Sequence, residues 1–363
     1  MIITPKNTFQ LNQFISLPET IYLEDPDWVK PLAGSKVRDF YPSINPALRH
    51  SEIELHLALE GHMPVARVAS FVDRQYNLIH KEKTAFFGFF ESIDSPAVAK
   101  SLFSAVEHFA KQRGMQKITG PVDFSTNYQA GLLVEGFSRP SVMSPYNKTY
   151  YQKLIETCGY QKAMDLYSYV FDQKMEIPKR ILRVAQIVEH KRPEISVKSF
   201  NQISGINKTA VLKTLYNESF ANNWGFIPMG SAEFSSLLRS LAILGHESLN
   251  YIAFDQKSPI GLLLTVPDLY SPEFDRSKGT PSFRTTTSRL RVTVLGILPA
   301  YRNKGIESLL GITVLTDAFK KGYREIEFSV VLENNNEMNN LVRREFGLPV
   351  NKTFRVYEKP IVN

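Results

Sequence analysis

Apolar residues recur at helical spacing in the segment after Pro299. They stand at Ile306, Leu309, Leu310, Thr313, Val314 and Ala318. This spacing predicts a helix with one buried face, and Lys320, Lys321 and Gly322 are typical of its C-terminal end. An apolar stretch through Leu295–Ile297 comes before the helix and predicts a strand. A basic loop containing Arg302, Lys304 and Gly305 joins the strand to the helix.

A second strand is predicted directly after this helix. The segment Glu325–Leu332 is rich in β-branched and aromatic residues, which favour strands. Glu333 and the run Asn334–Asn336 follow, and then a short helix that ends near Gly347. Thr353–Lys359 is predicted as the last strand.

The N-terminal half shows the same order of elements. Strands are predicted at Leu55–Leu59 and Val65–Phe71 around a Gly61 turn, then at Thr84–Phe90, with a helix from Ser95 and Pro96 to Arg113 and Gly114. A short helix at Tyr150–Thr157, Gly159 and a strand at Ala163–Phe171 complete this half. The recurrence at long range predicts a tandem repeat of one fold.

The join between the two halves is predicted at Asp172–Glu194. Met175–His190 has helical spacing after Pro178, and Arg192 and Pro193 end it. We therefore predict a first domain at 1–174, a helical linker at 175–194 and a second domain at 195–363. A polar, irregular stretch at Pro267–Ser288 suits either a lid over a substrate site or a mobile insertion.

Composition agrees with a two-domain globular chain. The chain has 363 residues, which is longer than a domain with a single hydrophobic core usually is, and 43% of them are hydrophobic. Cys158 is the single cysteine, so no internal disulfide forms, and we expect a buried structural thiol. The N-terminus lacks the apolar core of a signal peptide, and no run approaches the ~18 apolar residues of a membrane span. We expect a cytoplasmic protein without a membrane partner.

The formal net charge is +7, with an isoelectric point near 9.2. The cations are scattered, which suits a polyanionic cofactor and would equally suit loose contact with nucleic acid. No RNA-binding signature or zinc-finger spacing favours a nucleic-acid function. The seven histidines form no pair at helical spacing, so we expect no metal site.

The loop before the helix at Ile306 has the features of an anion cradle. A helix N-terminus presents unpaired N–H groups and partial positive charge, which together bind phosphate. Arg302 and Lys304 would add cations, and Gly305 would let the backbone approach a ligand. Taken alone, Arg302–Glu307 is more typical of a solvated turn; the surrounding elements favour the cradle.

The segment Ile195–Pro360 resembles the GCN5-related N-acetyltransferase (GNAT) superfamily. That family carries Arg/Gln-x-x-Gly-x-Gly/Ala after its fourth strand, and Arg302, Gly305 and the strand ending at Ile297 match it. The resemblance implies two tandem GNAT-like domains of α/β (α+β) class, each a mixed, mostly antiparallel twisted sheet flanked by helices. The whole chain resembles an uncharacterised bacterial group of paired acetyltransferase-like proteins.

The resemblance also implies a binding site for acetyl-CoA or another acyl-CoA as co-substrate. Backbone of Leu295, Gly296 and Ile297 would pair with the pantetheine arm. The loop Arg302, Asn303, Lys304, Gly305 and Ile306 would hold the pyrophosphate, and Asn335 corresponds to the family's asparagine after strand five.

Two positions depart from the family pattern. Glu307 stands where the family has a small residue, and its carboxylate would be poorly placed if it pointed at a pyrophosphate. It could instead point outward, where an acid in the first turn favours the helix dipole. The tyrosine that serves the family as general acid corresponds to Val342 or Arg343, so Tyr357, Tyr301 or water would replace it, or turnover would be inefficient.

The candidate general bases are Glu327 and Glu333, on and just after the strand beside the expected thioester. Each would equally suit a solvated carboxylate at a strand edge. Ser329 could orient the acceptor.

The first half lacks a comparable cradle, because Glu91 and Asp94 place negative charge between its strand and its helix. We expect that domain not to bind CoA in the usual way. Its insertion Gly120–Ser144, with Asp123 and several hydroxyl and amide side chains, suits substrate recognition and a surface loop equally.

The leading expectation is acyl transfer, most simply of acetyl from CoA, to the amine of a small molecule or peptide. A non-catalytic acyl-CoA sensor or scaffold is the competing class, and Glu307 and Val342 motivate it. Aminoacyl transfer from tRNA is a third possibility, suggested by the tandem layout and the basic charge.

Overall fold

The computed structural model describes residues 1–30, 40–41, 43–205, 207–244, 247–272 and 287–361. The chain divides into two compact units. Unit 1 comprises Met1–Leu166 together with Lys352–Asn363, and unit 2 comprises Tyr167–Asn351. Each unit is described by itself.

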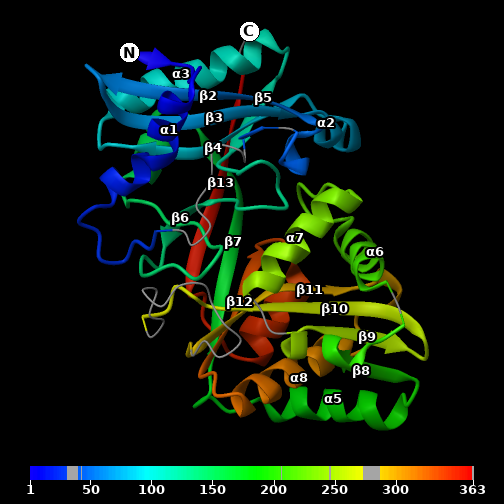
Figure 1. Cartoon of the computed structure of the whole chain (residues 1–363). Helices are drawn as coiled ribbons and strands as arrows, with labels where there is room; N and C mark the ends of the chain where they lie inside the picture. The colour runs from blue at the N-terminus through cyan, green and yellow to red at the C-terminus, as the bar shows by residue number, and fades with distance from the viewer. Residues whose placement is uncertain (31–39, 42, 206, 245–246, 273–286, 362–363) are drawn as a thin grey trace. The chain divides into compact units, whose positions relative to one another are not determined.

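Unit 1 is a mostly antiparallel sheet with helices on both faces (Figure 1). Its strands follow the order β1-β2-β3-β4-β5-β13, and β6 also pairs with β13. Their bounds are β1 Ile2–Ile3, β2 Ser51–Glu60, β3 Met63–Asp73, β4 Thr84–Ser92, β5 Lys117–Gly120, β6 Leu132–Glu135 and β13 Lys352–Pro360. The helices are α1 Thr8–Ile21, α2 Arg74–His80, α3 Pro96–Gln112 and α4 Tyr151–Thr157.

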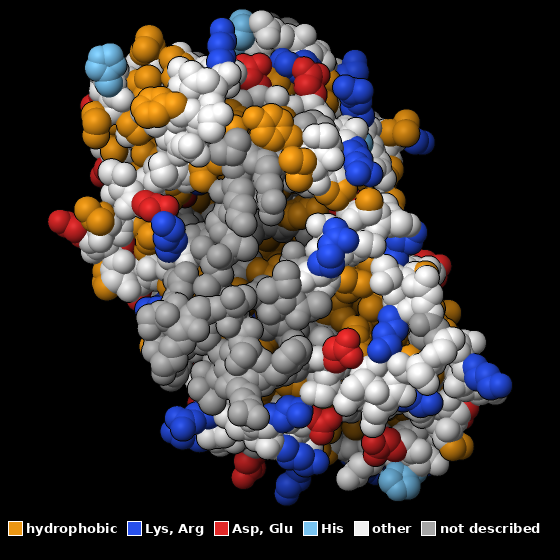
Figure 2. Space-filling model, in the orientation of Figure 1, with side chains coloured by type: hydrophobic (Ala, Val, Ile, Leu, Met, Phe, Trp, Pro, Cys, Tyr) orange, Lys and Arg blue, Asp and Glu red, His pale blue; other side chains and the backbone are white. Residues whose placement is uncertain are grey.

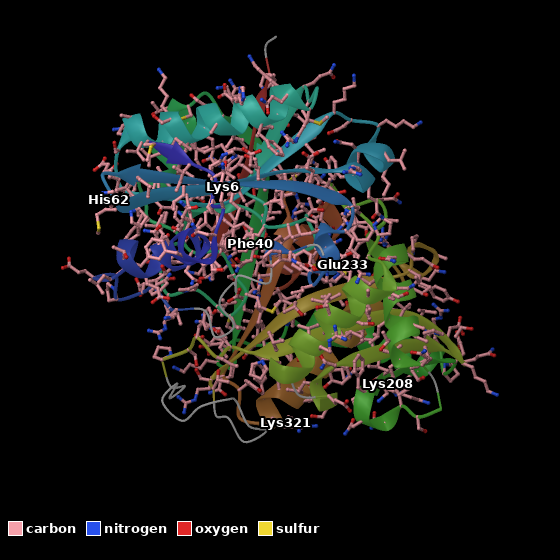
Figure 3. All side chains as sticks on the ribbon, turned by 45° about the horizontal axis from the view of Figure 1, so that its top comes forward. Lys6, Phe40, His62, Lys208, Glu233 and Lys321 are labelled. Carbon is pink, nitrogen blue, oxygen red and sulfur yellow. The ribbon has the colours of Figure 1, made fainter. Side chains whose placement is uncertain are left out.

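The two faces of this sheet bury different clusters. Helix α3 begins at the N-cap Ser95, whose side chain accepts from Val98 N–H, and it buries Leu102 and Phe103 against one face. Helix α1 buries Phe14 in a second cluster, where Phe40, labelled in Figure 3, packs edge-on against it. Successive side chains of β3 point to opposite faces of the sheet, so Val68 joins the first cluster and Ala69 the second.

Unit 2 repeats this plan. Its strands follow the order β8-β9-β10-β11-β12-β7. Their bounds are β7 Gln161–Asp172, β8 Ile195–Ser199, β9 Tyr251–Asp255, β10 Ser258–Pro267, β11 Arg289–Ile297 and β12 Glu325–Leu332. The helices are α5 Lys179–Lys191, α6 Lys208–Phe220, α7 Ser231–Leu244, α8 Ile306–Lys320 and α9 Asn336–Asn339, followed by a π-helical turn at Asn340–Glu345. Helices α5 and α8 cover one face, and α6 and α7 the other (Figure 1).

The predicted fold class and tandem repeat are confirmed. In each unit an antiparallel run of strands ends in one parallel pair, β4 with β5 and β11 with β12, joined by α3 or α8. The predicted bounds of β12 and the predicted end of α8 also hold, with Gly322 at a φ of 93° just after the helix. Helices α1, α6 and α7 were not predicted.

The division of the chain differs from the expected 1–174, 175–194 and 195–363. Strand β7 passes from unit 1 into unit 2 between Leu166 and Tyr167. Helix α5, expected as a linker, packs against α8 inside unit 2. The final strand β13 belongs to unit 1, because it pairs with β5 and buries Phe354, Val356 and Tyr357 there. Of the predicted insertion Pro267–Ser288, residues 273–286 lie outside the described residues.

Strands β11 and β12 separate along their length. Their parallel register runs from the pair Arg289 and Glu325 to the pair Val292 and Phe328, although β11 continues to Ile297 and β12 to Leu332. The carboxyl-terminal parts of the two strands therefore open a notch in the sheet of unit 2.

Candidate functional site

A cavity of about 640 Å³ lies at this notch. Its wall comes from four segments: the end of β11, the end of α6 with the residues after it, the loop before α8, and the residues after β12. Of the sequence-predicted residues, those that line it are Leu295, Gly296, Ile297, Arg302, Asn303, Gly305 and Asn335. Lys304 and Ile306 are outside the described lining.

The loop before α8 depends on glycine at one position. Gly305 is the N-cap of α8 with a φ of 81°, a left-handed conformation that favours glycine. A Cβ built there would lie 2.8 Å from Val184 Cγ1 and 2.9 Å from Val188 Cγ2, both on α5. Ile306 is fully buried in the core of the unit. The loop is thus held between α5 and the core.

The two cations predicted to flank an anion are engaged with backbone carbonyls. Arg302 Nε donates to Ile297 O at 3.3 Å, and its Nη2 donates to Ser219 O at 2.5 Å. Lys304 Nζ donates to Ala300 O at 2.7 Å. Arg302 therefore ties β11 to α6 and shapes the cavity, and Lys304 braces the turn.

Glu307 is half-buried and lines the cavity. Burial raises the pKa of its carboxyl, and nearby backbone N–H groups oppose the rise. Its place in the cavity wall disfavours the outward-pointing alternative. Across the cavity, Asn303 Nδ2 donates to Glu337 Oε1 at 3.0 Å.

Asn335 and Val342 have structural roles here. The Asn335 side chain accepts from Met338 N–H at 3.1 Å and caps α9. Val342, at the family's tyrosine position, is buried in the core. The Tyr301 hydroxyl donates to Asp255 Oδ2 at 2.9 Å. No tyrosine is among the described residues that line the cavity.

Glu327 and Ser329 belong to a buried charged cluster where β11 and β12 are still paired. Ser329 Oγ donates to Glu327 Oε1 at 2.7 Å and accepts from Arg291 Nε at 2.8 Å. Arg291 Nε lies 3.9 Å from Glu327 Oε1, and the two residues are register partners. Burial lowers the pKa of Arg291, while Glu327 and Asp268 raise it. None of the three is in the described cavity lining, so they lie beside the notch and not in it.

Two other candidate catalytic residues, Glu333 and Tyr357, are not among the described residues that line the cavity. Glu333 is half-buried after β12, where its carbonyl accepts from Asn339 Nδ2 at 3.1 Å, and it is not in the described lining. Tyr357 lies in the core of unit 1, and its hydroxyl donates to Glu156 Oε1 at 3.2 Å. Packing of unit 1 accounts for Tyr357, so we assign it no catalytic role.

The wall contributed by α6 was not predicted from the sequence. It includes Ser219, whose buried Oγ has no hydrogen-bond partner in the described part of the chain, and the aromatic residues Phe220 and Trp224. The run from Asn222 to Gly225, which breaks a helical stretch, is the signal that could have indicated a turn here.

The equivalent place in unit 1 is filled by its own chain. After β5, Val122 N–H donates to Phe87 O at 2.8 Å, and a Cβ at Gly88 would lie 2.1 Å from Val122 O. Phe89 N–H donates to Asp123 Oδ1 at 2.9 Å, and burial raises the pKa of Asp123 to about 6. This geometry favours a packing role for the loop around Asp123 over substrate recognition.

Surface charge, metal-ligand groups and membrane-spanning helices are the other features for which the sequence leads to an expectation. On the face shown in Figure 2, Lys and Arg side chains are scattered and form no continuous stripe. Within the described residues, no group of three or more His, Cys, Asp and Glu is arranged to hold a metal ion. No described helix has the length and apolar character required to cross a membrane.

No protein-family model matches the chain. In sequence, the chain is 28% identical over 370 residues to Protein YghO of Escherichia coli, covering 98% of this chain and 94% of that protein. It is 27% identical over 376 residues to the bacterial ceramide synthase of Caulobacter vibrioides, covering 99% and 97%.

Solved structures share the fold over the whole chain. The tandem GNAT protein from the clavulanic acid biosynthesis pathway superposes with a TM-score of 0.58 at 10% identity, covering 100% of this chain and 99% of that one. Other solved structures with similar scores are described as GCN5-related N-acetyltransferases. The chain therefore has the fold of the GCN5-related N-acetyltransferases in their tandem form.

Proposed function

We propose that this protein transfers an acyl group from acyl-CoA to an amine, with the thioester bound in unit 2. The observation that carries the proposal is the cavity at the notch between β11 and β12, bordered by the glycine loop before α8. Unit 1, whose equivalent notch is filled by the loop after β5, would support the fold without binding the donor.

The edge of β11 is suited to the pantetheine arm. From Leu295 to Ile297 this strand pairs with β10 on one side, and on the other side it no longer pairs with β12. Its free edge can therefore hydrogen-bond the two amides of pantetheine as an added strand would. The same edge groups would polarise the thioester carbonyl.

The charged cluster supplies a path for the amine proton. The amine nitrogen attacks the thioester carbon, the C–S bond breaks, and the thiolate takes a proton from water. The amine proton would pass through water to Ser329 Oγ, which lies outside the described lining and already donates to Glu327 at 2.7 Å. The Glu327 carboxyl would then return this proton to the hydroxide that is left when water protonates the thiolate. Arg291, at 3.9 Å, balances the buried charge of Glu327 in the resting state.

For the acceptor, we propose the primary amine of a long-chain amino alcohol. The support is the 27% identity, over 99% of this chain, to a bacterial ceramide synthase. A ceramide is the amide of such an amine. Small polar amines and peptide amines are the other acceptors to be tested.

The test is release of free CoA thiol from acetyl-CoA and from a long-chain acyl-CoA over a panel of amines. The panel contains sphinganine, spermidine and a lysine peptide. Turnover with any amine supports the proposed function, and preference for sphinganine supports the proposed acceptor. Binding of acyl-CoA without thiol release would instead favour the sensor, and tight, salt-sensitive tRNA binding would favour aminoacyl transfer.

A further inference from the structure

The cavity in unit 2 is poor in positive charge for a pyrophosphate site. Its described charged lining residues are Arg302, Glu307 and Glu337, one cation against two carboxylates. The Arg302 guanidinium is already shared between the carbonyls of Ile297 and Ser219. The Lys304 ammonium donates to Ala300 O, outside the described lining.

Glu307 also places a negative charge where a pyrophosphate would lie. Anions bind a helix N-terminus by accepting its free N–H groups. Glu307 stands in the first turn of α8 and lines the same cavity. A pyrophosphate bound there would lie close to this carboxylate, and the two like charges would repel each other.

The rest of the wall suits a neutral, amide-containing ligand. Amide side chains come from both sides, at Asn222, Asn223, Asn334 and Asn336. The Ser219 hydroxyl is buried against the cavity without a hydrogen-bond partner in the described residues, so a ligand amide or carbonyl could satisfy it. Phe220 and Trp224 add apolar surface for a chain of methylene groups.

Building on the proposed function, we propose that this site recognises its donor through the S-acyl-pantetheine arm, and that Glu307 makes the nucleotide diphosphate contribute little to binding. The donor class is an S-acylpantetheine thioester, which both CoA and a carrier protein present. Glu307 then determines donor specificity by disfavouring the pyrophosphate.

The test is calorimetric titration of the full-length protein with acetyl-CoA and with S-acetylpantetheine. For the wild type we expect the two dissociation constants to agree within about threefold. In Glu307→Ala, acetyl-CoA should bind about tenfold more tightly, because the carboxylate that repels the pyrophosphate is removed, while S-acetylpantetheine changes less than about twofold. Glu60→Ala, which removes an exposed carboxylate of unit 1, is the control for net charge.

The inference is overturned if wild-type protein binds acetyl-CoA more than about thirtyfold tighter than S-acetylpantetheine. It is also overturned if neither Glu307→Ala nor Glu307→Gln tightens acetyl-CoA binding while both remain folded by circular dichroism. Failure of every thioester to bind would instead reject the proposed function. A further titration with acetyl-loaded acyl carrier protein identifies the molecule that presents the pantetheine arm. Tighter binding than that of S-acetylpantetheine indicates a carrier protein, and equal binding indicates CoA.

Discussion

Gly305 shows how one residue without a side chain fixes the loop before α8. Its φ of 81° is strained for other residues, and a Cβ would meet Val184 and Val188 at 2.8 and 2.9 Å. We expect Gly305→Ala to cost about 1–2 kcal/mol of stability and to weaken donor binding. Thermal unfolding and titration with acetyl-CoA would measure both effects. A variant with wild-type affinity for CoA would contradict the loop assignment.

Gly311 is the matched control, since it lies inside α8 with no atom within 4 Å of an added Cβ. Gly311→Ala should leave donor binding unchanged. It should also raise the melting temperature, because alanine favours a helix interior by up to about 1 kcal/mol.

Arg302 acts through geometry more than through charge, because its guanidinium joins the carbonyls of Ile297 and Ser219. Lysine presents its donors on a single atom and cannot span both carbonyls in the same way. We expect Arg302→Ala and Arg302→Lys each to weaken acetyl-CoA binding about tenfold. Lys304→Ala should bind normally, since Lys304 lies outside the described lining. Full rescue by Arg302→Lys would show that charge alone matters.

Asp123 makes the stability of unit 1 depend on pH. Burial raises its pKa to about 6 from an ordinary value of 3.8, so the folded state holds a proton that the unfolded chain has lost between these values. The contribution of Asp123 to the free energy of unfolding is fully present below pH 3.8. It declines as the pH rises through about 6, by at most about 3 kcal/mol. Asp123→Asn should therefore be stabilising at pH 7.5 and neutral near pH 4 in thermal unfolding.

The control for Asp123 is Asp94→Asn, which neutralises an exposed carboxylate in the same unit. Its melting temperature should follow the wild type at both pH values. An equal gain from both variants would attribute the effect to net charge.

At the scale of elements, β11 and β12 form two different features along their length. The paired ends hold the Arg291, Glu327 and Ser329 cluster, and the separated ends form the cavity. We expect Glu327→Gln and Ser329→Ala to lower kcat about a hundredfold while the donor KM changes little, because neither residue is in the described lining. Steady-state kinetics of thiol release would measure both constants.

Glu325→Gln is the matched control on the same strand, because its partner Arg289 is partly exposed and distant in register from the notch. Its kcat should stay within about twofold of the wild type. An unchanged kcat in Glu327→Gln would remove the proposed proton path.

At the scale of the whole molecule, unit 1 is built from residues at both ends of the chain. The chain leaves unit 1 through β7, and its final strand β13 returns to complete the sheet of unit 1. We expect removal of residues 352–363 to destabilise unit 1, because Phe354, Val356 and Tyr357 are fully buried there. Hydrogen exchange should show loss of protection in α3 and retained protection in α8.

Deletion of residues 362–363, which keeps the packed Ile361, is the control and should preserve protection in both helices. Equal protection of α3 in the wild type and in the longer deletion would show that unit 1 folds without its last strand.

Local patterns were enough to predict much of the fold. The apolar spacing after Ile306, the glycine at 322 and the β-branched run at 325–332 each specify an element through interactions between near neighbours. Helix α6 was not predicted because its apolar residues are spread around the helix and its buried face includes the polar Ser219. Arg291 was not predicted because a lone arginine in a strand carries no local signal.

The sequence by itself determined the repeated order of strands and helices and the glycine loop, because backbone preferences and periodicity act over a few residues. The packing of distant segments, in contrast, places Tyr357 in unit 1, Glu307 in the cavity wall and the end of α6 beside the same cavity. Each of these depends on which distant segments pack together. Pairing between residues far apart in the chain leaves no mark on local spacing.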